Sequence, residues 1–172
     1  LLNELVVLTA QRFLNEEVHG ADIVYEFHKP LVQATVYRTM GAARRQYLHR
    51  LIADELMRGG DSTDAAQVAL HLVAGAAQDR QHEALPYLLR AADDAVSVFG
   101  NHEAVALLSS ALRVATASPQ AQVSLPQLYL NLGESYKRLG KFEQAVTAWR
   151  TALPLADDGE RASLRRCMAR AL

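Results

Sequence analysis

The sequence of 172 residues contains a single cysteine, Cys167, and this scarcity restricts the chemistry open to the chain. One cysteine forms neither an internal disulfide nor a metal site built from several thiolates, and a free thiol suits a reducing compartment. Long apolar runs are also missing, because no stretch approaches the roughly 18 to 20 residues needed to cross a bilayer. These absences predict a soluble, cytoplasmic protein that has no membrane partner.

The sequence also lacks an excess of charge of either sign. Its 18 basic and 19 acidic residues leave a formal net charge of −1. Such a balance provides no general attraction to the phosphates of nucleic acid or to an anionic membrane. We therefore expect a protein or peptide partner, and no direct contact with nucleic acid.

Motifs for catalysis and cofactor binding are missing as well. The six histidines occur without a His-Glu-x-x-His pattern, and there is no Gly-x-Ser-x-Gly elbow. Gly140 and Lys141 invite comparison with a P-loop, but six residues separate Gly133 from Gly140, and Phe142 follows the lysine where serine or threonine is needed. We expect no enzyme activity, no cofactor and no metal site in this chain.

Most of the sequence places apolar residues three and four positions apart, which is the spacing of an amphipathic helix. This pattern predicts an all-α fold. The expected helices lie near 2–11, 30–40, 43–57, 64–77, 83–98, 102–116, 125–139, 142–153 and 160–172.

Local signals mark several helix ends. Ser124 and Gln127 have the spacing of a capping box, in which the serine side chain accepts from a backbone N–H of the first turn. Gly100 and Gly140 suit the left-handed residue that ends a helix, and Asn101 is a candidate cap for the helix that follows.

Residues 12 to 28 interrupt the helical pattern. Ile23, Tyr25 and Phe27 alternate with other side chains, and the sequence His-Gly-Ala-Asp before them supplies a turn. We expect a small N-terminal β-hairpin here, the wing of a partial winged-helix-like module that covers residues 1 to 58.

Charge decides between two roles for this hairpin. The hairpin carries one arginine, Arg12, and more acidic residues, which are Glu16, Glu17, Asp22 and Glu26. Such a surface repels phosphate, so we favour a structural or regulatory wing over one that contacts DNA.

Two segments of the second half repeat each other. Ala104-Val105, Leu107-Leu108 and Ala111-Leu112 align with Ala145-Val146, Ala148-Trp149 and Ala152-Leu153 at an offset of 41 residues, from position 104 to position 145. A tetratricopeptide unit has about 34 residues, and the surplus falls in the loop-like stretch 116 to 122.

The second segment carries large, small and aromatic residues at the positions that the tetratricopeptide pattern requires. They are Tyr129, Leu132, Gly133, Tyr136, Gly140, Phe142, Ala145, Trp149, Ala152 and Leu153. Residues 126 to 159 therefore resemble a tetratricopeptide repeat. Small residues at 133 and 145 would let two antiparallel helices approach closely, while the rings at 136, 142 and 149 fill the wedge between this pair and its neighbours.

The rest of the second half resembles the same family more weakly. Residues 85 to 118 match with aliphatic residues in place of most aromatics, and residues 160 to 172 look like the first helix of a third unit. The resemblance implies that residues 62 to 172 form a tetratricopeptide-like superhelix of paired helices.

Residues 24 to 56 resemble the region that follows the ATPase core in bacterial STAND-type regulators, which include large LuxR-type activators, antibiotic-regulatory proteins and multidomain cyclases. The matching residues are Phe27, Leu31, Val32, Tyr37, Arg44, Arg45, Leu48, His49, Ile52 and Ala53. Lys29 departs from the pattern, which usually has histidine there. This resemblance implies a piece of a longer protein, in which an ATPase core and an output domain lie outside these residues.

Two functions follow as expectations. In the first, the chain is a sensor or autoinhibitory arm of an ATP-dependent regulator of transcription or signalling. In the second, it is a stand-alone scaffold that binds a peptide segment of a partner. A sequencing result that reveals an upstream ATPase core favours the first.

Two groups of residues are the candidate contact sites. The first helix of each repeat lines the concave side of a tetratricopeptide superhelix, and there we expect partner contacts from Arg90, Asp93, Ser97, Gln127, Asn131, Glu134, Lys137 and Arg138. A basic cluster of Arg44, Arg45, His49 and Arg50 is either a solvated helix face or the surface that meets the ATPase core.

Overall fold

A computed structural model describes residues 2–20, 22–60, 64–75 and 78–170. The chain divides into two compact units, Leu1–Arg45 and Gln46–Leu172. The division falls within helix α3 (Ala42–Arg58), earlier than the segment boundary expected near residue 58. The reason is that the second part of α3 packs with the helices that follow it, through the fully buried Ala53.

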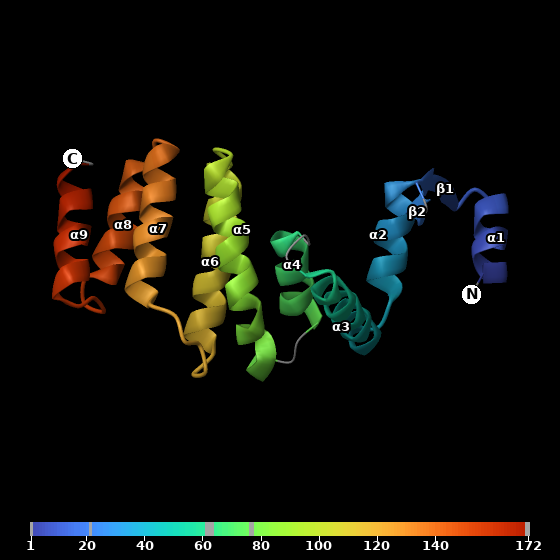
Figure 1. Ribbon diagram of the computed structural model, residues 1–172, viewed down its shortest axis with the longest axis horizontal. Helices are drawn as coiled ribbons and strands as arrows, with labels where there is room; N and C mark the ends of the chain where they lie inside the picture. Colours follow the sequence, from blue (N-terminus) through green and yellow to red (C-terminus); the bar gives the residue numbers. More distant parts are fainter. Residues whose placement is uncertain (1, 21, 61–63, 76–77, 171–172) are drawn as a thin grey trace. The chain divides into compact units, whose positions relative to one another are not determined.

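The first unit contains the expected hairpin. Its elements are α1 (Leu2–Ala10), β1 (Leu14–His19), β2 (Asp22–Phe27) and α2 (Pro30–Thr39), followed by the start of α3. The two strands, labelled in Figure 1, pair antiparallel, with Leu14 opposite Phe27 and His19 opposite Asp22. Among the described residues of this unit, Leu14, at 8% exposure, is the single buried apolar side chain.

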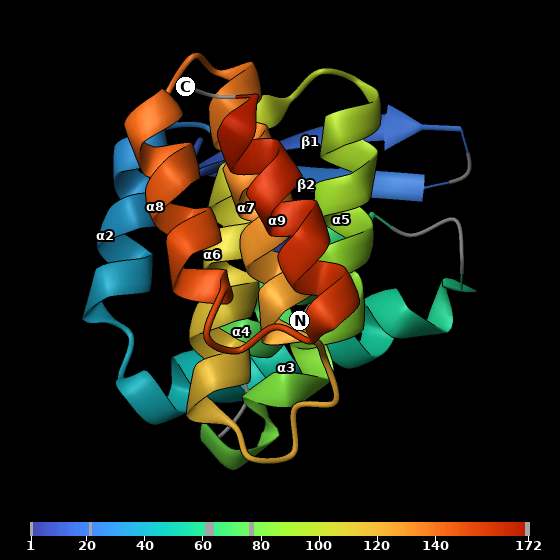
Figure 2. The ribbon, with the colours of Figure 1, turned by 90° about the vertical axis from the view of Figure 1, so that its left-hand side faces the viewer.

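The second unit contains helices joined by short loops, and no strand among its described residues. After α3 come α4 (Ala65–Gly75), the 3₁₀ helix η2 (Gln78–Ala84), α5 (Leu85–Ser97), α6 (Asn101–Ala117), α7 (Leu125–Arg138), α8 (Phe142–Ala152) and α9 (Asp158–Ala169). From α5 to α9, each helix packs beside the next one in the chain (Figure 1), and Figure 2 looks along this stack from the α9 end. The structure confirms the predicted all-α fold with a small N-terminal β-hairpin, and its second unit is repeat-like.

Two hydrophobic clusters hold the second unit together. The larger cluster draws buried residues from α3 to α8, including Val68, Leu88 and Leu108. The smaller one centres on Trp149 of α8 and Leu164 of α9. Tyr129 and Tyr136 of α7 pack against both clusters, so α7 joins them into one continuous core.

The packing of α7 on α8 depends on one glycine and one tryptophan. Trp149 is 0% exposed, and its indole Nε1 donates to the backbone oxygen of Leu130 at 3.2 Å. A Cβ atom on Gly133 would lie 2.1 Å from that same nitrogen. Ala145 of α8 is fully buried in the same cluster as Trp149. The predicted close approach of the two helices is confirmed at Gly133.

Phe142 does not fill the wedge that the sequence predicted for it. Its ring is 50% exposed, because it is the first residue of α8 and follows directly on the turn at the end of the helix pair. Tyr136 and Trp149 occupy the interior in its place.

The turn between α5 and α6 differs from the expected one. Gly140 has a φ of 72° after α7, as predicted, but Gly100 has a φ of −73°. The left-handed residue is Phe99, with a φ of 62° and an exposure of 88%. At the offset of 41 residues, Phe99 corresponds to Gly140, so both repeats share the turn geometry although one has a bulky residue there. Asn101 is the first residue of α6 and not its cap, because Gly100 takes the cap position; the Asn101 side-chain amide donates to the backbone oxygen of Phe99 at 3.3 Å.

Replacing Phe99 by glycine should raise the free energy of unfolding by about 1 kcal/mol. Glycine adopts a positive φ without a steric penalty, and the exposed ring sacrifices little burial. Urea unfolding followed by circular dichroism measures the change. Phe99→Ala is the matched control, because it removes the ring and keeps the strained Cβ. If Phe99→Ala raised the free energy of unfolding by the same amount, the effect would come from removal of the ring and not from the positive φ.

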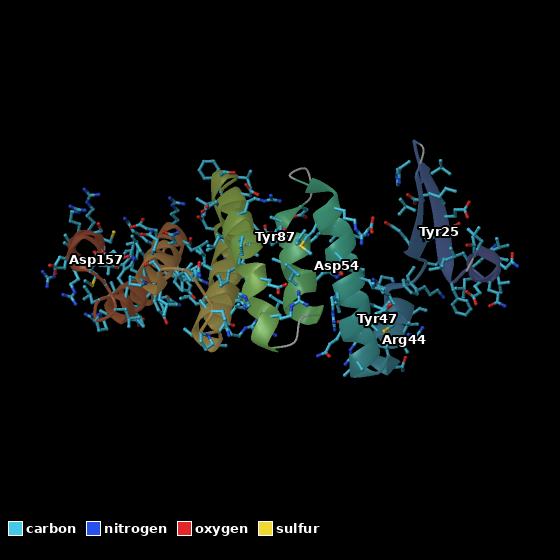
Figure 3. All side chains as sticks on the ribbon, turned by 60° about the horizontal axis from the view of Figure 1, so that its bottom comes forward. Tyr25, Arg44, Tyr47, Asp54, Tyr87 and Asp157 are labelled. Atoms are coloured by element: carbon cyan, nitrogen blue, oxygen red, sulfur yellow. The ribbon has the colours of Figure 1, made fainter. Side chains whose placement is uncertain are left out.

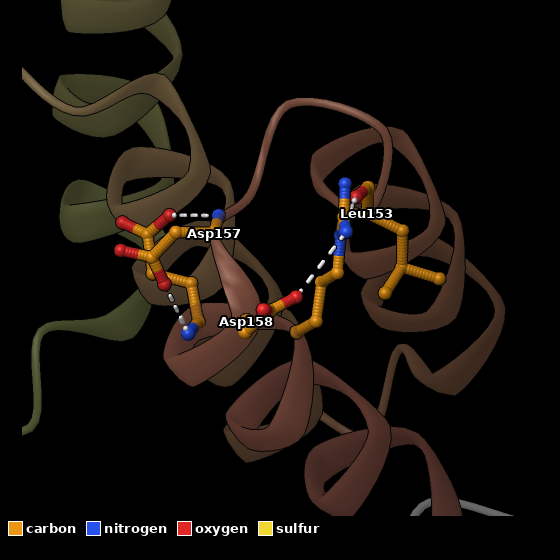
Figure 4. A network of polar contacts seen from close by, with 5 residues as sticks. Leu153, Asp157 and Asp158 are labelled. Carbon is orange, nitrogen blue, oxygen red and sulfur yellow. Dashed lines mark hydrogen bonds and ion pairs between the residues drawn. The ribbon is translucent and has the colours of Figure 1, made fainter.

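Capping confirms one expectation and corrects another. Ser124 accepts from the backbone N–H of Gln127 at 3.2 Å, as predicted, but the side chain of Gln127 turns to Asn131, so this is no capping box. The complete box lies at the start of α9, where Asp157 and Glu160 each accept from the backbone N–H of the other (Figure 4).

Candidate functional site

Helices α5, α6 and α7 line a small cavity of about 190 Å³. It is lined by Ala92, Asp93 and Val96 of α5, Leu108 of α6, and Asn131, Glu134, Ser135 and Arg138 of α7. Four of the eight predicted contact residues meet here: Asp93, Asn131, Glu134 and Arg138. We call this cavity the α5/α7 groove.

The groove combines an apolar part with a polar part. Ala92, Val96 and Leu108 contribute apolar surface from two helices, and the first and last of them are also part of the larger core cluster. Because both signs of charge line so small a volume, the groove suits one aliphatic side chain of a peptide flanked by polar groups, and not a large aromatic ligand.

The charges of the groove are partly matched within α7. The Lys137 ammonium lies 3.6 Å from a carboxylate oxygen of Glu134, and both side chains are about one-third exposed. The amide oxygen of Asn131 accepts from Gln127 at 2.8 Å. Gln127 and Lys137 therefore support groove residues from outside the cavity.

The remaining predicted residues of α5 lie outside the groove lining. The guanidinium of Arg90 sits 5.9 Å from the ring centre of Tyr87, which Figure 3 labels on the same helix. The Ser97 hydroxyl donates to the backbone oxygen of Asp94 at 2.7 Å. Both side chains are engaged along α5 itself.

The sequence interpretation missed a contact from α9. The thiol of Cys167 on α9 lies near the carboxylate of Glu134, so α9 adjoins the edge of the groove. Burial, and after it this neighbouring carboxylate, raise the pKa of the Cys167 thiol. A raised pKa keeps the sulfur protonated and poorly nucleophilic near neutral pH. The sequence signal for Cys167 was only its place on the apolar stripe of α9.

The basic cluster of α3 does not form one common surface. Arg44 is exposed (labelled in Figure 3), whereas the guanidinium of Arg45 donates to the backbone oxygens of Tyr37 at 3.1 Å and Met40 at 3.0 Å. Arg45 also lies over the Tyr37 ring, 5.4 Å from its centre. Its charge therefore meets the carbonyl end of α2.

His49 is occupied in the second unit. Its Nδ1 lies 2.9 Å from Nδ1 of His71 on α4, and both side chains are half-buried. Burial, and after it the neighbouring His49, lower the pKa of His71. Arg50 is exposed on the same helix. Of the four residues in the cluster, only Arg44 and Arg50 extend into solvent.

A second, larger cavity contains none of the predicted residues. It measures about 650 Å³ and lies between the start of α5, including Leu85 and Leu89, and the loop residues 120 to 123. The loop that the sequence marked as surplus to the repeat length thus forms one wall of this cavity.

Neither a metal cluster nor a spanning helix occurs within residues 2–20, 22–60, 64–75 and 78–170. No group of three or more histidine, cysteine, aspartate or glutamate side chains there is placed to hold a metal ion. No helix in that part of the chain has the length and apolar character needed to cross a membrane.

Comparison with known proteins assigns no family. Neither a protein-family model nor a curated protein matches this chain. The arguments for function therefore come from the residues and their geometry.

Proposed function

We propose that this chain is a protein-interaction and regulatory arm of a cytoplasmic bacterial ATP-dependent regulator of transcription or signalling. In this proposal α5 to α8 are two tetratricopeptide-like pairs, and the α5/α7 groove holds a segment of a partner or of the regulator's own ATPase core. The observation that carries the proposal is that Asp93, Asn131, Glu134 and Arg138, chosen from repeat position, line one cavity.

The exposed apolar surface of the first unit supports the proposal of a regulatory arm that packs against another part of the protein. Leu2, Val6, Leu31 and Val36 are all exposed. A unit this small buries little of its apolar surface, and apolar surface on this scale is typical of sites that another protein part covers. An ATPase core elsewhere in the same polypeptide would supply that cover.

The second unit supports the alternative of a peptide-binding scaffold. Its groove is built from α5, α6 and α7 alone, so peptide binding needs nothing from the first unit. The two candidates differ in whether the groove controls ATP hydrolysis.

A charge reversal in the groove separates the two candidates. In the full-length protein, Glu134→Arg combined with Arg138→Glu should change the basal rate of ATP hydrolysis by about tenfold, equivalent to about 1.4 kcal/mol. The reason is that the reversal opposes the charges of whatever segment the groove holds. Steady-state phosphate release measures the rate.

The matched control reverses two exposed charges of α8, outside the groove, as Glu143→Arg with Arg150→Glu. It should leave the rate unchanged. An unchanged rate in the groove variant would contradict a regulatory groove. A full-length protein without ATP hydrolysis would leave the scaffold as the better candidate.

A further inference from the structure

Two histidines from different helices bring the same ring nitrogen to one point. Nδ1 of His49 on α3 and Nδ1 of His71 on α4 are 2.9 Å apart, and the ring centres are separated by 4.9 Å with planes inclined by 46°. A hydrogen bond between two neutral imidazoles needs one protonated and one bare Nδ1. The two Nδ1 atoms therefore face each other, one as the donor and the other as the acceptor of this hydrogen bond.

The close approach of the two helix backbones sets the distance between the two Nδ1 atoms. Gly75, at the end of α4, lies so close to α3 that a Cβ there would be 2.6 Å from the backbone nitrogen of Arg50 and 2.9 Å from Cβ of His49. The two helices thus meet along backbone near the histidines. A pair held in this way needs little ordering of side chains before it binds a ligand.

We propose that His49 and His71 form a two-imidazole site for a divalent transition-metal ion, with Cu²⁺ and Ni²⁺ as the ions that fit it best. Neutral imidazole is a common protein ligand for these metals, and the site ties α3 to α4 when it is filled. Neither the groove nor the proposed function assigns any role to this pair.

The spacing of the nitrogens favours square coordination. Two imidazole nitrogens bound at about 2.05 Å in neighbouring positions of a square lie about 2.9 Å apart, whereas a tetrahedral ion separates them by about 3.3 Å. The observed 2.9 Å matches the first geometry. Cu²⁺ and Ni²⁺ prefer tetragonal sites, and Cu²⁺ binds most tightly among the first-row divalent ions.

Proton balance is simple in this site. The proton shared by the two Nδ1 atoms moves through solvent to Nε2 of the same ring, so both imidazoles stay neutral and both Nδ1 lone pairs face the ion. Among the described residues no third acidic, cysteine or histidine side chain joins the pair.

Titration of the tag-free chain with Ni²⁺ and Cu²⁺ tests the site. Isothermal calorimetry should give one ion per chain, and His49→Gln or His71→Gln should each weaken binding about a hundredfold, because the second ligand then no longer acts at high effective concentration. His102→Gln, which removes an exposed histidine, should bind as the wild type does.

Two measurements on the wild type remain decisive if a histidine variant folds poorly. The electron paramagnetic resonance spectrum of bound Cu²⁺ should show coupling to two imidazole nitrogens. Hydrogen exchange should slow in α3 and α4 when Ni²⁺ is added, and not at the hairpin. Binding that survives in both glutamine variants, a spectrum with one imidazole, or unchanged exchange in α3 and α4 would overturn the proposal.

Discussion

Replacing Gly133 by alanine is expected to lower the free energy of unfolding by about 3 kcal/mol. The new methyl would stand 2.1 Å from Nε1 of Trp149 and 2.6 Å from two further atoms of the indole. Because Trp149 is completely buried and donates to the backbone of Leu130, the ring cannot move aside without losing packing or its hydrogen bond. Urea unfolding monitored by circular dichroism measures the loss.

A second substitution, Trp149→Phe, shows whether the indole causes the loss of stability in Gly133→Ala. The three crowded atoms, Nε1, Cδ1 and Cε2, belong to the five-membered part of the indole, which phenylalanine lacks. Trp149→Phe costs stability by itself, through a smaller ring and a lost hydrogen bond, but it makes room for the methyl at position 133. The double variant should therefore be more stable than additivity predicts, by about 1 to 2 kcal/mol.

Gly159→Ala is the matched control for the glycine change. Gly159 is an exposed glycine of α9, and a Cβ there would meet only Asp157 Oδ1, at 3.5 Å. Alanine should stabilise that position by about 0.5 kcal/mol, through helix propensity. A Gly133→Ala protein as stable as the wild type would contradict the close packing of α7 on α8.

Replacing Gly75 by alanine should cost about 2 to 3 kcal/mol, and this loss comes from the backbone. A Cβ at position 75 would lie 2.6 Å from the backbone nitrogen of Arg50, 2.9 Å from Cβ of His49 and 3.0 Å from the carbonyl carbon of His49. No rotamer change relieves such contacts, so α3 must move away from α4. The stability measurement is again urea unfolding, with Gly159→Ala as the control.

The same variant should separate the two histidines. If α3 shifts, the Nδ1 atoms of His49 and His71 lose their 2.9 Å contact, and the imidazole resonances of both should change in the NMR spectrum. The resonance of the exposed His102 should stay unchanged. A destabilised protein with unchanged His49 and His71 signals would show that the methyl is accommodated elsewhere.

Much of the fold could be predicted because it depends on local sequence. The hairpin follows from the alternation at 23 to 27 and the turn before it, and the helices follow from apolar spacing. Gly133 and Trp149 were correctly placed in contact because a repeat pattern encodes which residues face the partner helix. The predicted burial of Phe142 was wrong, since its position in the pattern does not reveal that the end of the helix pair is open to solvent.

The candidate site was predictable only in part. Asp93, Asn131, Glu134 and Arg138 share the groove because their helix positions face the same side. Arg90 and Ser97 lie on the same helix as Asp93, yet their side chains make contacts within α5. Such choices depend on rotamers and neighbours that periodicity does not record.

The sequence by itself determined the helices, the hairpin, the repeat and the small-to-large pairing of Gly133 with Trp149. Only the tertiary structure decided that Phe99 takes the left-handed turn, that Arg45 meets the end of α2, that Cys167 reaches Glu134, and that His49 faces His71. The physical reason is the distance along the chain over which each effect acts. Periodicity and turn propensity act over a few neighbouring residues, whereas these contacts depend on how the chain places one element against another.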